Sequence, residues 1–252
     1  MKYFIVLSAL VLFAACSDSP DAPGGTLPVV QNCRILETES SGDTVVIAWD
    51  SLTVEVDGYK VWFSDTDPGN WSVIAQVEGT TVQDIATSTG YYCVDAIKGI
   101  DVSEEQSNKA NNITVVFELS DTLTVDGVNG IRFEEAQTTT GDATSADFAQ
   151  DLYIAKSGDT ILMYRGNTEP GTYPGGTNSL LADASGRVAP APGDAAWKGS
   201  AAVNGGSGYF VELESGYFSY FLVDTVATDY VTIIYSQYQP IESLRLFNWL
   251  TL

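Results

Sequence analysis

The sequence predicts an all-β protein built from two successive antiparallel β domains. Short runs of alternating apolar and polar residues recur along the chain, and they are rich in the β-branched and aromatic residues that favour strands: 45–50, 58–65, 71–77, 90–97, 113–119 and 151–155. Clusters of Gly, Asp, Asn, Ser and Pro separate these runs and supply turns. No segment keeps the spacing of an amphipathic helix over three turns; the nearest, IESLRLFNWL at 241–250, is equally compatible with a strand.

The N-terminus has the features of an export signal. Lys2 is followed by an apolar run that is too short to cross a bilayer as a mature helix, so we expect residues 1–15 to be a cleaved signal peptide. Two small residues, Ala14 and Ala15, lead directly into Cys16, and this arrangement resembles a bacterial lipobox. The resemblance implies that Cys16 carries a lipid, which would anchor the mature chain in a membrane.

The residues after Cys16 suit an anchored, exported protein. The stretch 16–27 is polar and rich in Pro and Gly, so it is predicted to be a flexible tether. By the same resemblance, Ser17 next to the cysteine permits transfer to the outer membrane. We therefore expect an outer membrane lipoprotein of the cell envelope, facing the periplasm or the cell surface.

The chain is strongly acidic, with 33 Asp and Glu against 11 Lys and Arg and a formal net charge of −22. A phosphate backbone would be repelled by this charge, so DNA and RNA are excluded as partners. The acidic residues form no run of five like charges, and their spread along the chain indicates solubility rather than a site.

The sequence contains no histidine, and this excludes most catalytic and cofactor chemistry. Neither a Ser-His-Asp nor a Cys-His arrangement can form, and zinc loses its commonest ligand. The turn DTDPGN at 65–70 lacks the Gly and Glu that a calcium loop requires at fixed positions. We therefore predict no catalytic residue, no metal and no cofactor. A glycan-active enzyme that uses a carboxylate pair, Asp147 with Asp151 or Glu134 with Glu135, remains an alternative.

The order of strands and turns over 28–112 resembles a fibronectin type III module. Five residues match core positions of the second, third and sixth strands of that family: Trp49, Tyr59, Val61, Val94 and Ala96. The resemblance implies a seven-stranded sandwich that acts as a spacer or a binding module and does not catalyse a reaction. Because side chains alternate along a strand, we expect Trp49 to share a buried face with Val45 and Ile47.

Three tryptophans form the candidate binding surface. Alternation in the third strand places Trp62 on the outer face, and Trp71 opens the strand that follows. Trp197 lies in the long small-residue segment 177–208, where loop length favours a functional surface. Exposed tryptophans stack on sugars or dock on proteins, so we expect a carbohydrate or protein partner at Trp62, Trp71 and Trp197. The alternative is that neighbouring loops cover these side chains.

The second domain is expected to span 113–252. Hairpins are predicted over 117–133 and 145–166, with turns near Asp126–Gly127 and Ser157–Gly158, and a three-strand meander is predicted over 208–239. Over 115–240 the order of a short Asp-rich strand, a Gly-rich insertion and a closing meander is similar to the HmuY-like β lipoproteins. Haem ligation does not carry over from that family, because the chain has no histidine and the mature part has only one methionine, Met163.

Two cysteines remain after lipidation of Cys16. An exported pair can form a disulfide if the fold brings the two Cα atoms within about 7 Å. Alternation over 90–97 places Cys93 on the face opposite the apolar set, which argues against a bond to Cys33, and both outcomes stay open.

Two functions of different class follow from the sequence. In the first, the protein is a noncatalytic surface-binding lipoprotein whose fibronectin-like domain is a spacer. In the second, both domains are structural components of an envelope assembly. Clustering and exposure of the three tryptophans would favour binding, and their burial would favour the structural role.

Overall fold

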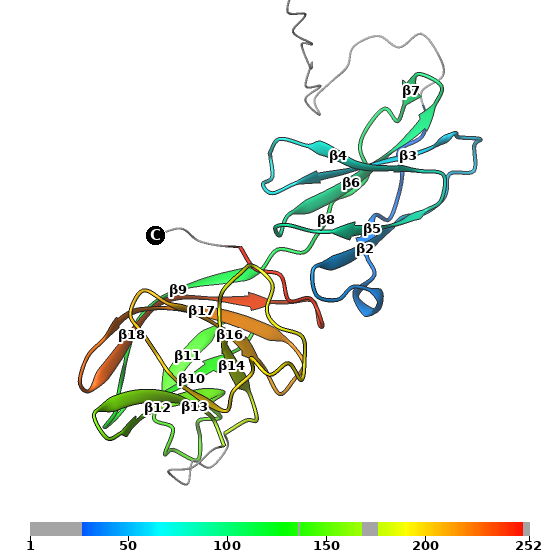
Figure 1. Ribbon diagram of the computed structural model, residues 1–252. Helices are drawn as coiled ribbons and strands as arrows, with labels where there is room; N and C mark the ends of the chain where they lie inside the picture. The colour runs from blue at the N-terminus through cyan, green and yellow to red at the C-terminus, as the bar shows by residue number, and fades with distance from the viewer. Residues whose placement is uncertain (1–26, 136, 168–175, 249–252) are drawn as a thin grey trace, which may run out of the picture.

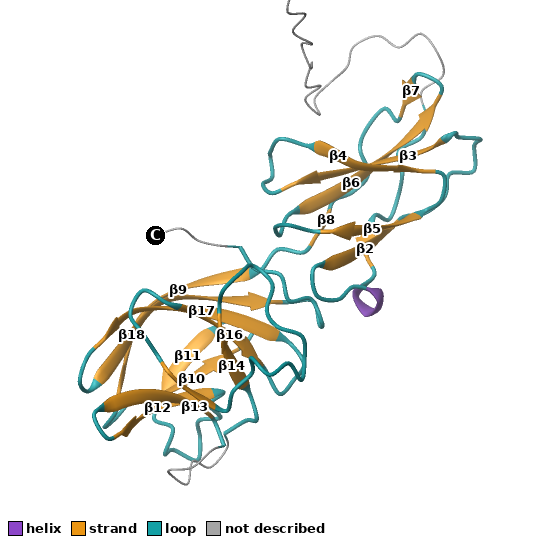
Figure 2. Ribbon diagram, viewed as in Figure 1, coloured by secondary structure: helices purple, strands orange, loops and turns teal. Residues whose placement is uncertain are grey.

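The computed structural model describes residues 27–135, 137–167 and 176–248. The predicted signal peptide, the predicted lipidation site at Cys16 and most of the predicted tether lie outside these ranges. The described chain forms two β lobes, which confirms the predicted all-β class (Figure 1). Its only helix is a single 3-10 turn, η1 (Glu37–Glu39), beside the first lobe (Figure 2). Within these ranges no helix has the length and apolar character needed to cross a membrane.

The first domain is a sandwich of two antiparallel sheets with a fibronectin-like strand arrangement. One sheet has the order β1-β2-β5, with bounds β1 (Arg34–Ile35), β2 (Thr44–Ala48) and β5 (Thr81–Ile85). The facing sheet has the order β4-β3-β6-β7, with β8 also paired to β6; its bounds are β3 (Gly58–Ser64), β4 (Ser72–Val77), β6 (Tyr91–Lys98), β7 (Asp101–Val102) and β8 (Ala110–Asn111).

Two serines bridge the gap between β7 and β8. Ser103 donates its backbone N–H to the Ala96 carbonyl, and its hydroxyl accepts the Ala96 N–H at 2.8 Å. Ser107 repeats this pattern with Val94, whose N–H reaches the Ser107 hydroxyl at 2.9 Å. The buried backbone of β6 therefore keeps its hydrogen bonds where the last strand bulges away.

The core of the first domain confirms the expected strand faces. Val45, Ile47 and Trp49 all belong to one buried cluster. The Trp49 ring meets the Tyr59 ring edge-on, with centroids 5.4 Å apart. Cys33 belongs to the same cluster and Cys93 does not, although both thiols are buried. The two thiols do not form a disulfide, because β6 directs Cys93 to its other face.

The second domain is a pair of five-stranded antiparallel sheets. One sheet has the order β11-β10-β12-β13-β15, with bounds β10 (Gly130–Phe133), β11 (Thr138–Gly141), β12 (Leu152–Ser157), β13 (Thr160–Arg165) and β15 (Ser200–Ala202). The other has the order β14-β16-β17-β18-β9, with bounds β9 (Val115–Thr124), β14 (Leu180–Asp183), β16 (Gly208–Glu212), β17 (Phe218–Val226) and β18 (Tyr230–Gln239).

Two of the three predicted strand pairings in this domain are correct. β12 and β13 form the expected hairpin, and β16, β17 and β18 form the expected meander. The hairpin predicted over 117–133 is wrong, because β9 pairs with β18 and β10 pairs with β11 and β12. The chain crosses from one sheet to the other between β9 and β10, a step that local alternation and turn residues do not distinguish from a hairpin.

The segment 177–208, predicted to be one long loop, contains two short strands. β14 adds an edge strand to the meander sheet, and β15 adds one to the opposite sheet. Between them, Lys198 exchanges both backbone hydrogen bonds with Leu181. The segment therefore joins the edges of the two sheets and is not a free loop.

The predicted boundary between the domains does not separate their cores. After β18 the chain turns back to the first domain, and Ile241, Leu244 and Leu246 are buried in the cluster that contains Trp49. Leu27, which the sequence placed at the end of the tether, is buried in the same cluster. Segment 241–247 thus adopts neither of the regular forms compatible with its sequence and instead fills a gap in the first sandwich.

Backbone hydrogen bonds hold this C-terminal segment in place. Gly42 donates to the Ser243 carbonyl and accepts from the Arg245 N–H, both at 2.9 Å. Gly42 has a φ of +65°, and a Cβ there would lie 2.7 Å from the Arg245 guanidinium, so only glycine fits without a shift. The contact thus depends on a residue type that permits close approach of the two segments.

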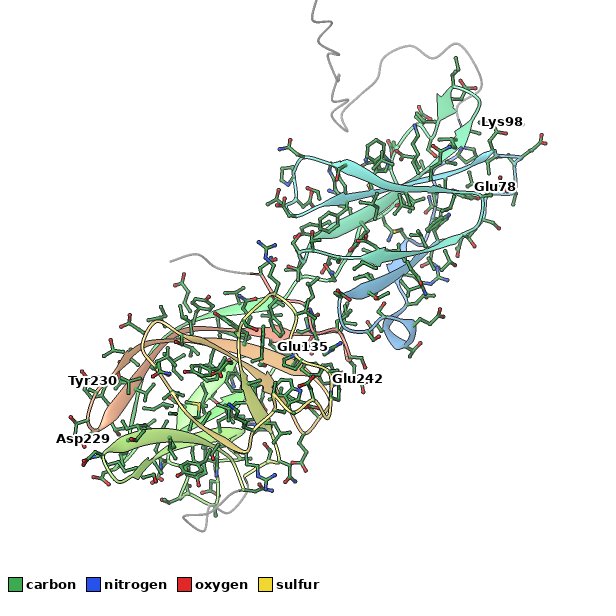
Figure 3. All side chains as sticks on the ribbon, viewed as in Figure 1. Glu78, Lys98, Glu135, Asp229, Tyr230 and Glu242 are labelled. Carbon is green, nitrogen blue, oxygen red and sulfur yellow. The ribbon has the colours of Figure 1, made fainter. Side chains whose placement is uncertain are left out.

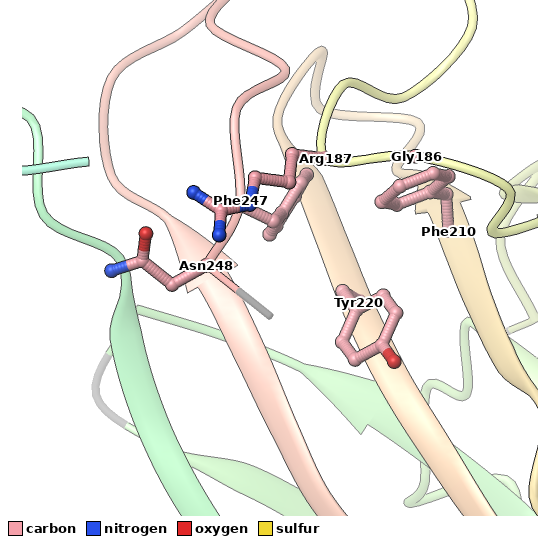
Figure 4. A pocket seen from close by; sticks show the side chains of 6 residues that line it. All are labelled: Gly186, Arg187, Phe210, Tyr220, Phe247 and Asn248. Atoms are coloured by element: carbon pink, nitrogen blue, oxygen red, sulfur yellow. The ribbon is translucent and has the colours of Figure 1, made fainter. Parts of the chain in front are cut away.

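Two side-chain hydrogen bonds also link the first domain to the rest of the chain. Arg187 donates to the Thr87 carbonyl at 3.1 Å, and the Asn248 side chain accepts the Thr89 N–H at 3.2 Å. Arg187 and Asn248 also line a hollow, together with Phe247 and three other residues (Figure 4). The hollow has no room for a water molecule, and its rings Phe210, Tyr220 and Phe247 belong to one buried cluster of the second domain, so we interpret it as a packing gap and not as a ligand site.

Candidate functional site

The predicted tryptophan surface is not formed. Trp197 is only 8% exposed, packs on Phe218 with ring centroids 6.1 Å apart, and donates its indole N–H to the Ala191 carbonyl. Trp62 and Trp71 are half-buried, both in the first domain. The Lys109 ammonium lies over the Trp71 ring, 5.7 Å from its centroid. Trp197 is therefore a core residue of the second domain, and its place in the candidate binding surface was wrong.

Trp62 is held by a buried carboxylate. Its indole N–H donates to Asp95 Oδ2 at 2.8 Å, while Asp95 Oδ1 has no hydrogen-bond partner among the described residues. Burial raises the pKa of the Asp95 carboxyl to about 6, against the opposing effects of the Trp62 hydrogen bond and the nearby Lys60 charge. The outer face of β3 and β6 thus contains a buried carboxyl group whose charged form is destabilised, and it does not present an open aromatic surface.

The raised pKa of Asp95 predicts that the stability of the folded protein depends on pH. Because the pKa of Asp95 is higher in the folded than in the unfolded chain, its contribution is favourable below the unfolded pKa and is lost as the pH rises through about 6. Asn does not titrate and can still accept the indole N–H. Asp95→Asn should therefore stabilise the protein more at about pH 8 than at about pH 4, by roughly 2 kcal/mol.

Urea unfolding of wild type and variant at both pH values measures this difference. The other titrating carboxyl groups cancel in the comparison, because they are the same in both proteins. Equal stability changes at the two pH values would show that the Asp95 carboxyl titrates normally.

A second hollow lies at one end of the second sandwich. It has a volume of about 290 Å³ and lies where β10, β16 and β18 end and β12 begins. Eleven residues line it: Arg132, Phe133, Glu134, Glu135, Ala149, Asp151, Thr177, Leu213, Glu214, Ser215 and Tyr238. We call this hollow the acidic cleft. In size it matches the lower limit of small-ligand sites in proteins.

A buried aspartate forms the floor of the acidic cleft. Asp151 Oδ2 accepts the Phe133 backbone N–H at 2.8 Å, and Oδ1 accepts the hydroxyls of Thr177 and Ser179 at 2.9 and 3.0 Å. Burial raises the pKa of the Asp151 carboxyl, while these hydrogen bonds act in the opposite direction. Its oxygens are therefore engaged in joining β10, β12 and the start of the 177–208 segment.

Glutamate side chains that follow strands of both sheets line the cleft. After β10, Glu134 pairs with Arg132 at 2.6 Å, and Glu135 beside it is exposed. After β16, both oxygens of Glu214 accept hydrogen bonds from Asn178, which hold the pKa of Glu214 below its usual range. These bonds fix the position of the Glu214 charge at the rim.

A stacked pair of tyrosines contributes to the lining of the cleft through Tyr238. Tyr238 stacks on Tyr217 with ring centroids 5.6 Å apart. Burial raises the pKa of Tyr238 to about 12, and the nearby Tyr217, Glu135, Asp151 and Glu134 act in the same direction. The Tyr238 hydroxyl therefore stays protonated at neutral pH. Three carboxyl groups of the cleft lie close enough to raise its pKa.

Part of the rim of the acidic cleft lies near the junction of the domains. Glu242 approaches Gly216 in the turn that follows the cleft residues Glu214 and Ser215, and the next residue, Ser243, bonds to the first domain. Figure 3 shows Glu135 and Glu242 where the second lobe approaches the first, while Asp229 and Tyr230 lie at its far end. A ligand in the cleft would therefore lie close to the segment that joins the two cores.

Some residues of the acidic cleft were predicted from the sequence, but as carboxylate pairs of a possible enzyme. Glu134, Glu135 and Asp151 were candidates for carboxylate pairs, whereas Asp147 is exposed and does not line the cleft. Arg132, Thr177, Glu214 and Tyr238 were missed, because the ends of distant strands bring them together. The described residues contain no group of three or more acidic or Cys side chains that could hold a metal ion.

No protein-family model matches the chain, and no curated protein matches it. Among solved structures, the chain is similar to a DUF4466 family protein from Parabacteroides merdae, with 11% identity, a TM-score of 0.38, and coverage of 84% of this chain and 99% of that one. It is also similar to titin kinase and its flanking domains, with 8% identity, a TM-score of 0.33, and coverage of 86% and 38%. Likenesses at this level carry no argument about function.

Proposed function

We propose that this protein is a noncatalytic cell-envelope lipoprotein, anchored through Cys16, whose second domain binds a small ligand or a partner side chain in the acidic cleft. The first domain then acts as a spacer between the membrane and the cleft. The observation that carries the proposal is the cleft itself, which combines an open volume of about 290 Å³ with charged rims and an apolar wall. A noncatalytic role is supported by Asp151, whose oxygens are engaged by three donors.

A structural envelope role is the second candidate. It is favoured by the junction, where Ile241, Leu244 and Leu246 enter the core of the first domain and tie the two lobes together. The burial of Trp197 favours it as well, because an exposed aromatic surface is lost. Such a protein would hold partners at a fixed separation and would not need the cleft.

Ligand binding in the cleft and a structural role predict different effects on partner affinity when a bulky side chain blocks the cleft. The mature chain would be used in a glycan array and in an envelope-protein pull-down, beside Ser215→Trp, which places a large ring in the lining of the cleft. Thr228→Trp is the matched control, since Thr228 is an exposed turn residue next to Asp229 at the far end of the domain (Figure 3). The proposal expects partners that bind wild type and Thr228→Trp and lose at least about tenfold in affinity with Ser215→Trp.

Other outcomes decide against ligand binding. Partners that bind all three proteins equally would support the structural role, and release of product from a bound glycan would show an enzyme. The anchor is tested separately by mass spectrometry of the membrane fraction, where an unacylated and fully soluble mature chain would contradict lipidation of Cys16.

A further inference from the structure

The charge of the acidic cleft restricts its ligand. Its lining carries four carboxyl groups and one guanidinium, in a protein whose formal net charge is −22. The Glu134 carboxylate is paired with Arg132, but the Glu214 charge is held by neutral Asn178 donors and is not neutralised. Anionic ligands are therefore repelled, and a positive group gains energy on approach.

The wall of the cleft adds an apolar surface to this charge. Phe133, Leu213 and Tyr238 line the hollow and are all buried, so their side chains are held firmly by the core. Aliphatic carbons gain from contact with such a surface, while a charged head prefers the carboxylates at the water-filled rim. A ligand with an aliphatic stem and a cationic end matches both parts.

The cation should be organic and not a metal ion. Among the described residues no three acidic or Cys groups converge closely enough to hold a metal. Ammonium and guanidinium groups instead present several N–H donors in different directions, which suits carboxylates that follow strands of both sheets. The volume of about 290 Å³ accommodates a side chain or a short amine and not a folded partner.

We propose that the acidic cleft binds an alkylammonium or alkylguanidinium group, with the stem against Leu213 and the cation between Glu135 and Glu214. The group is either a Lys or Arg side chain of a peptide or a free polyamine, which share this chemistry. The inference rests on the proposed binding function and names the ligand class for it.

Titrations with three probes test the ligand class. Spermidine represents a free polyamine, a capped Gly-Arg-Gly peptide represents a basic side chain, and maltose represents a neutral polyol. We expect one or both cations to bind the full mature chain, more weakly as ionic strength rises, and maltose not to compete. The stronger of the two cations identifies the source of the group.

Variants with opposite expected signs test the placement. The double variant Glu135→Gln with Glu214→Gln should weaken cation binding about tenfold or more, because it removes the two charges assigned to the cation. Arg132→Gln should strengthen it several-fold, because it removes a competing cation and frees Glu134. Glu78→Gln, an exposed acid of the first domain labelled in Figure 3, should leave affinity unchanged.

The outcomes separate this inference from the proposed function. A loss of binding in the double variant together with a gain in Arg132→Gln supports the inference, and unfolding cannot produce the gain. Cation binding that is equal in all variants overturns the placement. If maltose binds in a way that Ser215→Trp blocks while both cations fail, the cleft is a binding site but its ligand is not a cation. If all three probes fail, the cationic ligand class is rejected.

Discussion

Replacement of Trp49 by alanine should unfold the first domain or bring it close to unfolding. Trp49 is 3% exposed, lies in the main cluster of the sandwich and packs edge-on against Tyr59. Removal of a buried tryptophan costs about 3 to 5 kcal/mol, which is comparable with the whole stability of a small domain. Urea unfolding of the mature chain, followed by near-ultraviolet circular dichroism, measures the loss.

Two other variants show whether burial is the cause. Trp49→Phe keeps most of the packing and removes an indole N–H that has no hydrogen-bond partner among the described residues, so it should cost less than half as much. Trp62→Ala loses a half-buried ring and its bond to Asp95, for which we expect about 1 to 2 kcal/mol. Greater damage from Trp62→Ala than from Trp49→Ala would mean that the assignment of strand faces is wrong.

Alternation made the first domain predictable from sequence. Val45 and Ile47 of β2 and Trp49 directly after it share one cluster, as a period of two requires, and the same rule in β6 separates Cys93 from Cys33. These features depend on neighbours along one strand. The bulge at Ser103 and Ser107 was not predicted, because hydroxyl groups replace backbone groups there and leave no pattern in hydropathy.

The second domain shows where such reasoning ends. Trp197 was expected at a surface because its segment was predicted to be a long loop, but the segment's small residues, such as Ala182 and Ala189, pack in one cluster with the ring. The acidic cleft was missed because Arg132, Asp151, Glu214 and Tyr238 lie far apart in sequence and meet only when two sheets stack. In a chain with 33 acidic residues, composition does not indicate which of them converge.

The C-terminal segment gives the second large expected effect. Leu244 is fully buried in the cluster of the first domain, although it lies 195 residues after Trp49 and 150 after Val94, and the second domain lies between them. Leu244→Ala leaves a cavity there, for which the expected cost is about 3 to 5 kcal/mol. The loss of stability should appear in the first domain, because Leu244 shares its cluster with residues on the strands of that domain.

Hydrogen exchange with peptide resolution locates the loss. In Leu244→Ala, amide protection should fall in β2 and β6 by a larger factor than in β16 and β17. Leu181→Ala is the matched control, since Leu181 is also fully buried but belongs to the cluster of the second domain, and it should show the reverse order. If Leu244→Ala weakens only β16 and β17, the first sandwich closes without the C-terminal segment, and residues 28–112 form the independent module that the sequence predicts.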